Sequence, residues 1–204
     1  MHALALDTDR DDSPREDHIV VLSNVTWADY QRMLEVRGER RTPRMCYLEG
    51  RLEIMSPSQP HEELKSVIGC LVEVFCLERG IEFRTLGSWT IEDEAVNRGA
   101  EADECYVFGE RRKTLRPDLA IEVIWTSGGL NKLDIYRKLG VGEVWYWRKG
   151  RLSVHVLRGE VYEAAERSEV LPGIDLVELA SFLDRATTSA AIRDYRDALR
   201  GRDP

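Results

Sequence analysis

Apolar residues recur at intervals of three and four positions between residues 61 and 79, and this is the strongest periodic pattern in the chain. Such spacing is typical of a helix that buries one wide face. Gly80 follows the pattern, and a glycine in that place commonly ends a helix. The pattern therefore predicts a long amphipathic helix from about His61 to Arg79, whose apolar positions are Leu64, Val67, Ile68, Leu71, Val72, Phe75 and Cys76.

Short apolar runs elsewhere in the chain predict strands. Residues 45–48 and 51–55 flank a Glu-Gly pair and predict a β-hairpin. Residues 119–125 are almost continuously apolar, as expected of a strand that is buried on both faces. Further strands are predicted over residues 81–86, 89–91, 104–108, 144–147 and 152–157, and around residues 161–162.

Other segments have helical character. Thr26 and Asp29 approach a capping-box pattern at the start of a helix that stops near Gly38. Another helix follows Gly129 and ends at Gly140, and a polar helix from about residue 188 to residue 200 could fray or pack against a partner. The order of helices and strands predicts an α/β (α+β) domain built on a mixed central sheet.

The composition fits one globular domain. Of the 204 residues, 43% are hydrophobic and 32% are charged, which is enough apolar material for a core. We expect a single domain over residues 18–187, with a flexible acidic tail over residues 1–17 and a C-terminal helix and tail over residues 188–204. No apolar run approaches membrane-spanning length and the polar N-terminus lacks the features of a signal peptide, so a cytoplasmic protein without membrane contact is expected.

The net charge of −8 argues against a protein that coats nucleic acid nonspecifically, because such proteins carry basic surfaces. A nuclease remains compatible with this charge, since a metal-binding cluster of carboxylates makes a site acidic. The four cysteines form no Cys-x-x-Cys pair, and the four histidines show no zinc-ligand spacing. A zinc site is therefore not expected.

Glu122 is the residue that most needs a chemical explanation. It lies in the middle of the apolar strand, with three apolar residues on each side, and a buried carboxylate is costly unless it is paired or binds a metal. The alternative is a glutamate on an edge strand that points to solvent. Asp103 starts the preceding strand, and if the two strands are neighbours, the two carboxylates can converge on one ion. Mg²⁺ is commonly held by just one or two carboxylates together with water and substrate phosphate.

Two further features have both a chemical and a plain structural interpretation. Lys132 in the next helix could reach back over the strand end to position water or neutralise phosphate charge, or it could be a solvated lysine. The aromatic residues of the central strands could form a base-stacking platform. Core packing is the favoured interpretation, because these residues lie on buried strands: Trp125, Trp145, Tyr146 and Trp147.

A longer series of motifs runs through these residues in a fixed order. In chain order the motifs are Glu49-Gly50, Met55-Ser56-Pro57, His61, Gly99 to Cys105, Pro117 to Ser127, Lys132, Tyr136, Gly140-Val141 and Glu143-Val144-Trp145. Over residues 26–180 the chain resembles the Uma-two family of restriction-endonuclease-like proteins, within the PD-(D/E)XK nuclease superfamily.

The resemblance implies a mixed central β-sheet flanked by helices, which holds Mg²⁺ (or Mn²⁺) through Asp103 and Glu122, beside Lys132. Asp103 takes the place of the motif aspartate rather than Asp118, because Asp118 and Glu122 lie four residues apart on one strand. That separation is about 13 Å, which is too far for one ion.

The resemblance also points to the start of the long helix. An acidic residue on the first core helix often holds a metal-bound water in this superfamily, which makes Glu62 a candidate and Glu63 another. In the first turn of a helix, these carboxylates could instead serve only the positive end of the helix dipole. His61 could hydrogen-bond the site or the scissile phosphate, or merely cap the helix. Glu49 in the hairpin turn is a further candidate to face the site.

The implied function is a metal-dependent endonuclease that hydrolyses DNA phosphodiester bonds, with the catalytic residues Asp103, Glu122, Lys132, His61 and Glu62. Because many members of the superfamily pair two sites across a dimer, a homodimer is expected. The alternative is a catalytically inactive nuclease-fold module with a binding or regulatory role, for example one associated with mobile elements. A purely structural dimer, joined through the C-terminal helix, is a third hypothesis and predicts no metal binding.

Overall fold

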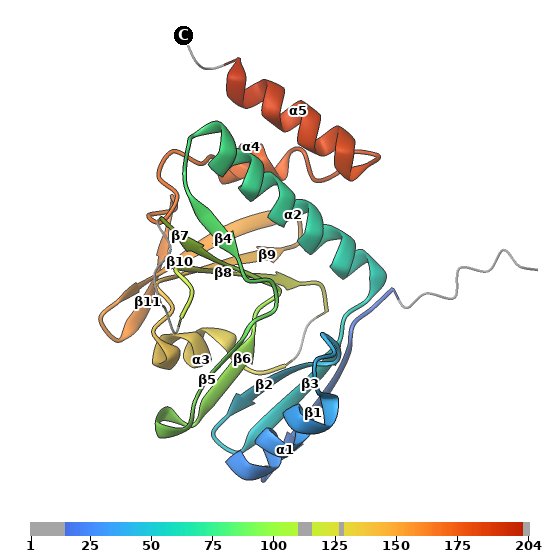
Figure 1. Ribbon diagram of the computed structural model, residues 1–204, viewed down its shortest axis with the longest axis vertical. Coiled ribbons are helices and arrows are strands. Elements are labelled where there is room, and N and C mark those ends of the chain that lie inside the picture. The colour runs from blue at the N-terminus through green and yellow to red at the C-terminus, as the bar shows by residue number, and fades with distance from the viewer. Residues whose placement is uncertain (1–14, 110–115, 127–128, 202–204) are drawn as a thin grey trace, which may run out of the picture.

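In the computed structural model, which describes residues 15–109, 116–126 and 129–201, helices surround two packed β-sheets (Figure 1). This mixed architecture of strands flanked by helices confirms the predicted fold class. The strands do not form one central sheet, however, but divide between a five-stranded and a six-stranded sheet. Residues 1–14 of the predicted acidic tail lie outside the described residues.

The five-stranded sheet is antiparallel throughout and has the order β1-β3-β2-β6-β5. Its strands are β1 (His18–Ser23), β2 (Arg44–Leu48), β3 (Arg51–Ser56), β5 (Thr90–Asp93) and β6 (Arg98–Glu101). The hairpin of β2 and β3 confirms the prediction, whereas β1 and β6 are strands that the sequence pattern does not predict. All residues of β6 are buried, but two of them are charged, so the segment lacks the apolar pattern of a buried strand.

Helix α1 (Trp27–Arg37) covers one face of this sheet, at the lower end of the molecule in Figure 1. Thr26 Oγ1 accepts a hydrogen bond of 3.1 Å from Asp29 N, and the Asp29 carboxylate accepts one of 3.0 Å from Thr26 N. The predicted capping box is therefore confirmed. Tyr30 of this helix packs with Met45, Tyr47 and Leu52 of the sheet in a small core cluster.

The six-stranded sheet is mixed and has the order β11-β10-β9-β8-β7-β4. Its strands are β4 (Phe83–Thr85), β7 (Glu104–Phe108), β8 (Leu119–Ile124), β9 (Glu143–Arg148), β10 (Arg151–Arg158) and β11 (Val161–Ala165). The neighbours β8 and β9 run parallel and are joined by α3 (Lys132–Leu139), while the other neighbours are antiparallel. The predicted unit of strand, helix and strand after residue 118 is confirmed.

The chain passes between the two sheets in the segment before Asp103. The strands predicted on either side of Gly87-Ser88 belong to different sheets, β4 to the larger and β5 to the smaller. Gly87 has a φ of +56°, which residues with a side chain rarely adopt. After a 3₁₀ turn, η1 (Glu94–Val96), and β6, the chain returns to the larger sheet as β7. Asp103, between β6 and β7, therefore lies where the two sheets meet.

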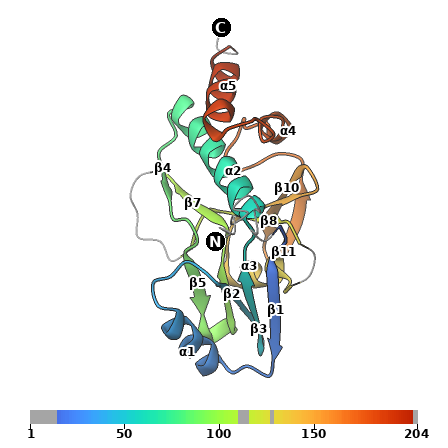
Figure 2. The same cartoon turned by 90° about the vertical axis from the view of Figure 1, so that its right-hand side faces the viewer.

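Helices α2 (Gln59–Glu78) and α4 (Leu176–Ala180) cover one face of the six-stranded sheet, α5 (Thr188–Arg200) packs on α2, and α3 lies on the other face of the sheet, toward the smaller sheet (Figures 1 and 2). Helix α2 starts two residues before its predicted start, at Gln59 rather than His61, because Ser58 caps it and Pro60 is tolerated in the first turn. Helix α5 has its predicted bounds. Its inner face packs on α2 within its own chain through Ala191, Tyr195 and Leu199.

Two predictions about individual residues are wrong. Trp145 and Trp147 are buried as predicted, but Trp125 is 45% exposed, because it lies one residue beyond the end of β8. Asp17, at the end of the predicted tail, is buried and accepts a hydrogen bond of 2.8 Å from Ser58 N. None of the described helices is long and apolar enough to cross a membrane.

Candidate active site

Asp103, the residue just before β7, lies opposite Glu122 of the neighbouring strand β8. Strands β7 and β8 are antiparallel, and the pairing of Glu104 with Ile121 places Asp103 opposite Glu122. The backbone N–H of Val123 donates a hydrogen bond of 2.6 Å to Asp103 Oδ2. Both carboxylates are fully buried, so the alternative that Glu122 is a solvent-facing residue of an edge strand is excluded.

Two residues of α3 hold the Glu122 carboxylate. Lys132 Nζ lies 2.6 Å from Glu122 Oε2, and the Tyr136 hydroxyl donates a hydrogen bond to Oε1. Lys132 and Tyr136 are four positions apart and therefore share one face of the helix, which begins at Lys132 because Asn131 caps it. Lys132 thus reaches back to the strand, and the alternative of a solvated lysine does not hold.

The buried ion pair changes the acidity of both partners. Burial raises the pKa of Glu122 to about 7, because desolvation of the carboxylate outweighs the attraction of Lys132. Burial also disfavours the charged form of Lys132, but the negative charge of Glu122 outweighs this effect and keeps the pKa of the amine well above its usual value. Lys132 is therefore a persistent positive charge at the site.

Arg44 and His61 surround the Asp103 carboxylate. The guanidinium of Arg44, the first residue of β2, forms an ion pair with Asp103 and lies 2.5 Å from Glu62 Oε1. His61 Nε2 lies 3.1 Å from Asp103 Oδ1. Burial acts to raise the pKa of Asp103, but the charge of Arg44 and the hydrogen bond of His61 outweigh it and hold the pKa well below its usual value. Asp103 is therefore ionised at neutral pH.

A further carboxylate fixes the other side of the His61 ring. His61 Nδ1 lies 3.0 Å from Asp17 Oδ2. Burial favours the neutral ring, but the hydrogen bonds with Asp103 and Asp17 outweigh it and raise the pKa of His61 to about 9. The side chain that caps α2 belongs to Ser58. Of the two sequence interpretations of His61, contact with the site is therefore the one that the structure shows.

One of the three other candidate carboxylates joins the cluster. Glu62 contacts Arg44 and its side chain is 40% exposed, so it connects the buried site with solvent. Glu63 is exposed and lines a separate groove. The side chain of Glu49 is 68% exposed and pairs with Arg98 at 2.9 Å, in the hairpin turn. Glu49 therefore does not face the site.

Glu53 is a residue of this region that the sequence interpretation missed. It lies in β3, is buried, and its Oε2 accepts a hydrogen bond of 2.6 Å from Leu130 N. Together with Lys132 and His61 it lines a cavity of about 50 Å³. A signal exists in the sequence, because Glu53 is a charged residue between apolar neighbours in a predicted strand, as Glu122 is.

The approach of Glu53 to the backbone requires a glycine at residue 129. Gly129 has a φ of +93°, and a Cβ atom added there would lie 2.3 Å from Glu53 Oε2. We expect Gly129→Ala to lower the free energy of unfolding by about 1–3 kcal/mol, through backbone strain and displacement of Glu53. Urea denaturation measures the loss.

Gly150→Ala is the matched control for this substitution. Gly150 has a φ of +81°, but nothing lies within 4 Å of a Cβ atom added there. The control therefore carries backbone strain without a clash, and Gly129→Ala should cost more. Equal losses in the two variants would contradict a contribution from the close approach of Glu53.

A protein-family model matches the part of the chain that contains most of the site residues. The model of the Uma2 (Uma-two) family, described as "Putative restriction endonuclease", matches residues 27–191. The chain belongs to the Uma2 family. The match confirms the resemblance predicted over residues 26–180, and the Uma2 region includes every residue of the site described above except Asp17.

The chain is also similar to a solved structure. This is the crystal structure of "a putative nuclease belonging to DUF820" from Anabaena variabilis ATCC 29413. The two chains are 15% identical, and the similarity covers 79% of this chain and 96% of that chain with a TM-score of 0.47. No curated protein matches this chain.

Proposed function

We propose that this chain is an endonuclease that hydrolyses phosphodiester bonds in DNA with Mg²⁺ or Mn²⁺ held by Asp103 and Glu122. The observation that carries the proposal is the pair of fully buried carboxylates, one just before β7 and the other opposite it on β8, with the charged amine of Lys132 2.6 Å from Glu122. Membership of the Uma2 family, which is described as "Putative restriction endonuclease", supports a nuclease reaction.

The residues fit a divalent cation of this kind. Carboxylate oxygens are the hard donors that Mg²⁺ prefers, and Mg²⁺ often binds only one or two of them, together with water and substrate phosphate. Among the residues that the structure describes, no group of three or more His, Cys, Asp or Glu side chains is arranged to hold a metal ion, so the donor set proposed here is limited to Asp103 and Glu122. Neither proposed ligand lines the cavity of about 50 Å³ beside Lys132, but that cavity exceeds the ~10–15 Å³ that one water requires, so a water can lie next to the lysine.

The residues around Glu122 have distinct roles in this proposal. A bound divalent ion would polarise the phosphate and lower the pKa of a bound water. Because Lys132 is protonated, it would stabilise developing negative charge or donate a proton, rather than accept a proton as a base. Tyr136 is a positioning residue, since its hydrogen bond fixes Glu122 Oε1 while Lys132 holds Oε2.

The residues around Asp103 complete the arrangement. His61 holds Asp103 from one side, and Asp17 fixes the His61 ring. Arg44 bridges Asp103 and Glu62, and a guanidinium group can bind two phosphate oxygens at once. Glu62 is partly exposed and would orient a water that enters from solvent.

A homodimer in the cytoplasm is part of the same proposal. Two copies of this chain would supply the two sites that can cut both strands of a duplex within one binding event. Sedimentation velocity tests the assembly. A monomer that still linearises plasmid in a single binding event would contradict the dimer.

Removal of divalent ions tests the proposed reaction. We expect the purified protein to convert supercoiled plasmid to nicked and linear forms in Mg²⁺ or Mn²⁺, because the ion supplies the polarised phosphate and activated water. Excess EDTA should abolish the activity, and added Mg²⁺ should restore it. Calorimetric titration of Mg²⁺ into the metal-free protein should show binding in the absence of DNA.

Three outcomes would change the conclusion. Metal binding without cleavage of DNA or RNA would favour the catalytically inactive module. Cleavage of RNA alone would replace DNA as the substrate. Nicking that persists in EDTA would contradict the dependence on a metal.

A further inference from the structure

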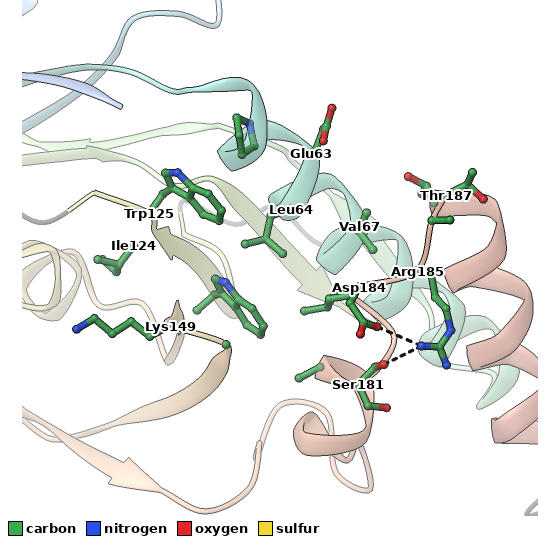
Figure 3. Close-up of a pocket in the computed structure, with 17 residues that line it drawn as sticks. Glu63, Leu64, Val67, Ile124, Trp125, Lys149, Ser181, Asp184, Arg185 and Thr187 are labelled. Carbon is green, nitrogen blue, oxygen red and sulfur yellow. Dashed lines mark hydrogen bonds and ion pairs between the residues drawn. The ribbon is translucent and has the colours of Figure 1, made fainter. Parts of the chain in front are cut away.

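A groove of about 910 Å³ opens on the surface of the six-stranded sheet. It is formed by the first turns of α2, the end of β8, the turn between β9 and β10, and the segment between α4 and α5. Figure 3 shows Leu64 and Val67 of α2 in succession along the groove, with Lys149 toward one end and Arg185 toward the other.

The groove lies directly beside the proposed active site. Ile124 lines both the groove and the cavity of about 50 Å³ that contains Lys132. On α2, Pro60 and Glu63 line the groove and flank the two site residues of that helix, at positions 61 and 62. A polymer that crosses the active site can therefore continue into the groove.

Trp125 presents an aromatic surface at the end of the groove that adjoins the site. The residue is 45% exposed, yet its indole N–H donates a hydrogen bond of 2.9 Å to the carbonyl oxygen of Arg15, which holds the ring in place. The largely buried Trp147 and the apolar side chain of Leu64 line the groove beside it. An ordered, exposed indole next to an apolar wall suits the flat face of a nucleic-acid base.

The positive charge of Lys149 lies at the same end of the groove. Lys149 lines the groove, whereas Arg148 and Arg151, the exposed end residues of β9 and β10 on either side of the turn, lie outside its lining. None of these three side chains forms an ion pair with another residue in the part of the chain that the structure describes. This turn is therefore a basic patch on a chain whose net charge is −8.

At the other end of the groove, two carboxylates offset the positive charge of Arg185. Arg185 Nε lies 2.7 Å from Asp194 Oδ2, and its Nη1 lies 3.1 Å from Asp184 Oδ1. A phosphate would therefore be attracted to the end with Trp125 and Lys149 more than to the end with Arg185. The aromatic face and the unpaired positive charge lie at the same end of the groove, where Ile124 separates it from the active-site cavity.

We propose that this groove holds an unpaired segment of the substrate strand, with a base stacked on Trp125 and the backbone phosphates near Lys149. The inference rests on DNA as the proposed substrate. A base within a duplex is covered on both faces by its neighbours, so stacking on an indole requires a base that has left the stack. The groove therefore favours DNA that is single-stranded or locally open beside the cleaved bond.

Binding of short oligonucleotides without metal tests this inference. The probes are a fluorescein-labelled twelve-nucleotide oligothymidylate, an abasic strand with the same number of phosphates, and a duplex of the same length. In EDTA, fluorescence anisotropy should show the tightest binding for the oligothymidylate. Trp125→Ala should weaken its binding about tenfold, as expected for the loss of one stacked base, and should leave binding of the abasic strand unchanged.

Two further variants separate stacking from charge. Trp125→Phe keeps an aromatic face and should retain most of the affinity for oligothymidylate. Lys149→Ala should weaken binding of the oligothymidylate and the abasic strand by the same factor. Lys138→Ala, an exposed lysine of α3 outside the groove, is the matched control and should have little effect.

The outcomes that overturn the inference are independent of catalysis. Equal affinity for the oligothymidylate and the abasic strand, or an unchanged affinity in Trp125→Ala, would exclude base stacking. Tighter binding of the duplex would exclude an unpaired segment. Because the measurement needs no metal and no cleavage, the groove can bind as proposed even if the nuclease proposal fails, and the reverse also holds.

Discussion

Replacement of Glu122 by glutamine is expected to slow plasmid nicking about a thousandfold or more. Glutamine keeps the shape of the side chain but removes the negative charge that would hold the metal ion between β7 and β8. Charge stabilisation by a bound metal contributes several kcal/mol, and ~4 kcal/mol corresponds to about three orders of magnitude in rate. The initial rate of nicking and the heat of Mg²⁺ binding should both fall in Glu122→Gln.

Glu104→Gln is the matched control for this substitution. Glu104 lies on β7 next to Asp103, and it pairs with Lys65 at 2.7 Å in a partly buried environment. The control therefore removes a paired carboxylate close to the site but not in it, and nicking should stay within a few-fold of the wild type. Comparable losses in the two variants would contradict the assignment of Glu122 as a metal ligand.

The part of the site around Glu122 can be predicted from sequence because it rests on local patterns. Glu122 interrupts an apolar strand, and the structure buries it in β8. Lys132 and Tyr136 lie one helical turn apart in α3, whose predicted end at Gly140 is also correct. A strand with a period of two and a helix with a period of 3.6 are enough to aim both side chains at Glu122 once β8 and α3 pack together.

The part of the site around Asp103 depends on contacts between distant segments. Arg44 is 59 positions from Asp103, and Asp17 is 44 positions from His61. Each is an isolated polar residue at the edge of an element, for which exposure is the usual expectation. No local pattern predicts that these residues meet, because the contact forms only when the two sheets pack against each other.

Buried, paired charges also explain why the second sheet escapes prediction. Glu101 of β6 is buried and accepts hydrogen bonds from Met45 N at 2.9 Å and from Thr90 Oγ1 at 2.6 Å. Arg98, at the other end of β6, is buried as well and pairs with Glu49 and Asp134. Charged residues in a sequence are usually taken as exposed, so β6 shows no strand pattern. Without β6, the sequence does not indicate that the hairpin of β2 and β3 belongs to a larger sheet.

Replacement of Lys132 by methionine is expected to lower the free energy of unfolding by about 3–5 kcal/mol at pH 9. The substitution leaves Glu122 fully buried with the Tyr136 hydroxyl as its remaining partner among the contacts described here. Loss of one member of a buried ion pair typically has an effect of this size, because the other charge stays desolvated. Urea denaturation measures the loss, and the nicking assay should show that activity is lost as well.

The loss of stability should shrink as the pH falls from 9 toward 7. Burial raises the pKa of Glu122 to about 7 even beside Lys132, and removal of the lysine charge raises it further. Near pH 7, Glu122 of the folded variant then binds a proton, whereas a glutamate in the unfolded chain, with a pKa near ~4.3, is ionised. Stability therefore increases as the pH decreases through the raised pKa. A loss that is constant between pH 7 and pH 9 would contradict an unpaired buried carboxylate.

The double variant Glu122→Gln with Lys132→Met separates the charges from the packing. A buried ion pair can often be replaced by uncharged residues at little cost, so the double variant should recover most of the stability lost in Lys132→Met. As a control, Lys65→Met removes the pair with Glu104, whose side chains keep some exposure to solvent, and should cost less than Lys132→Met. The double variant should still fail to nick DNA. Folding requires only that no buried charge is left unpaired, whereas the proposed reaction requires the carboxylate of Glu122 and the amine of Lys132.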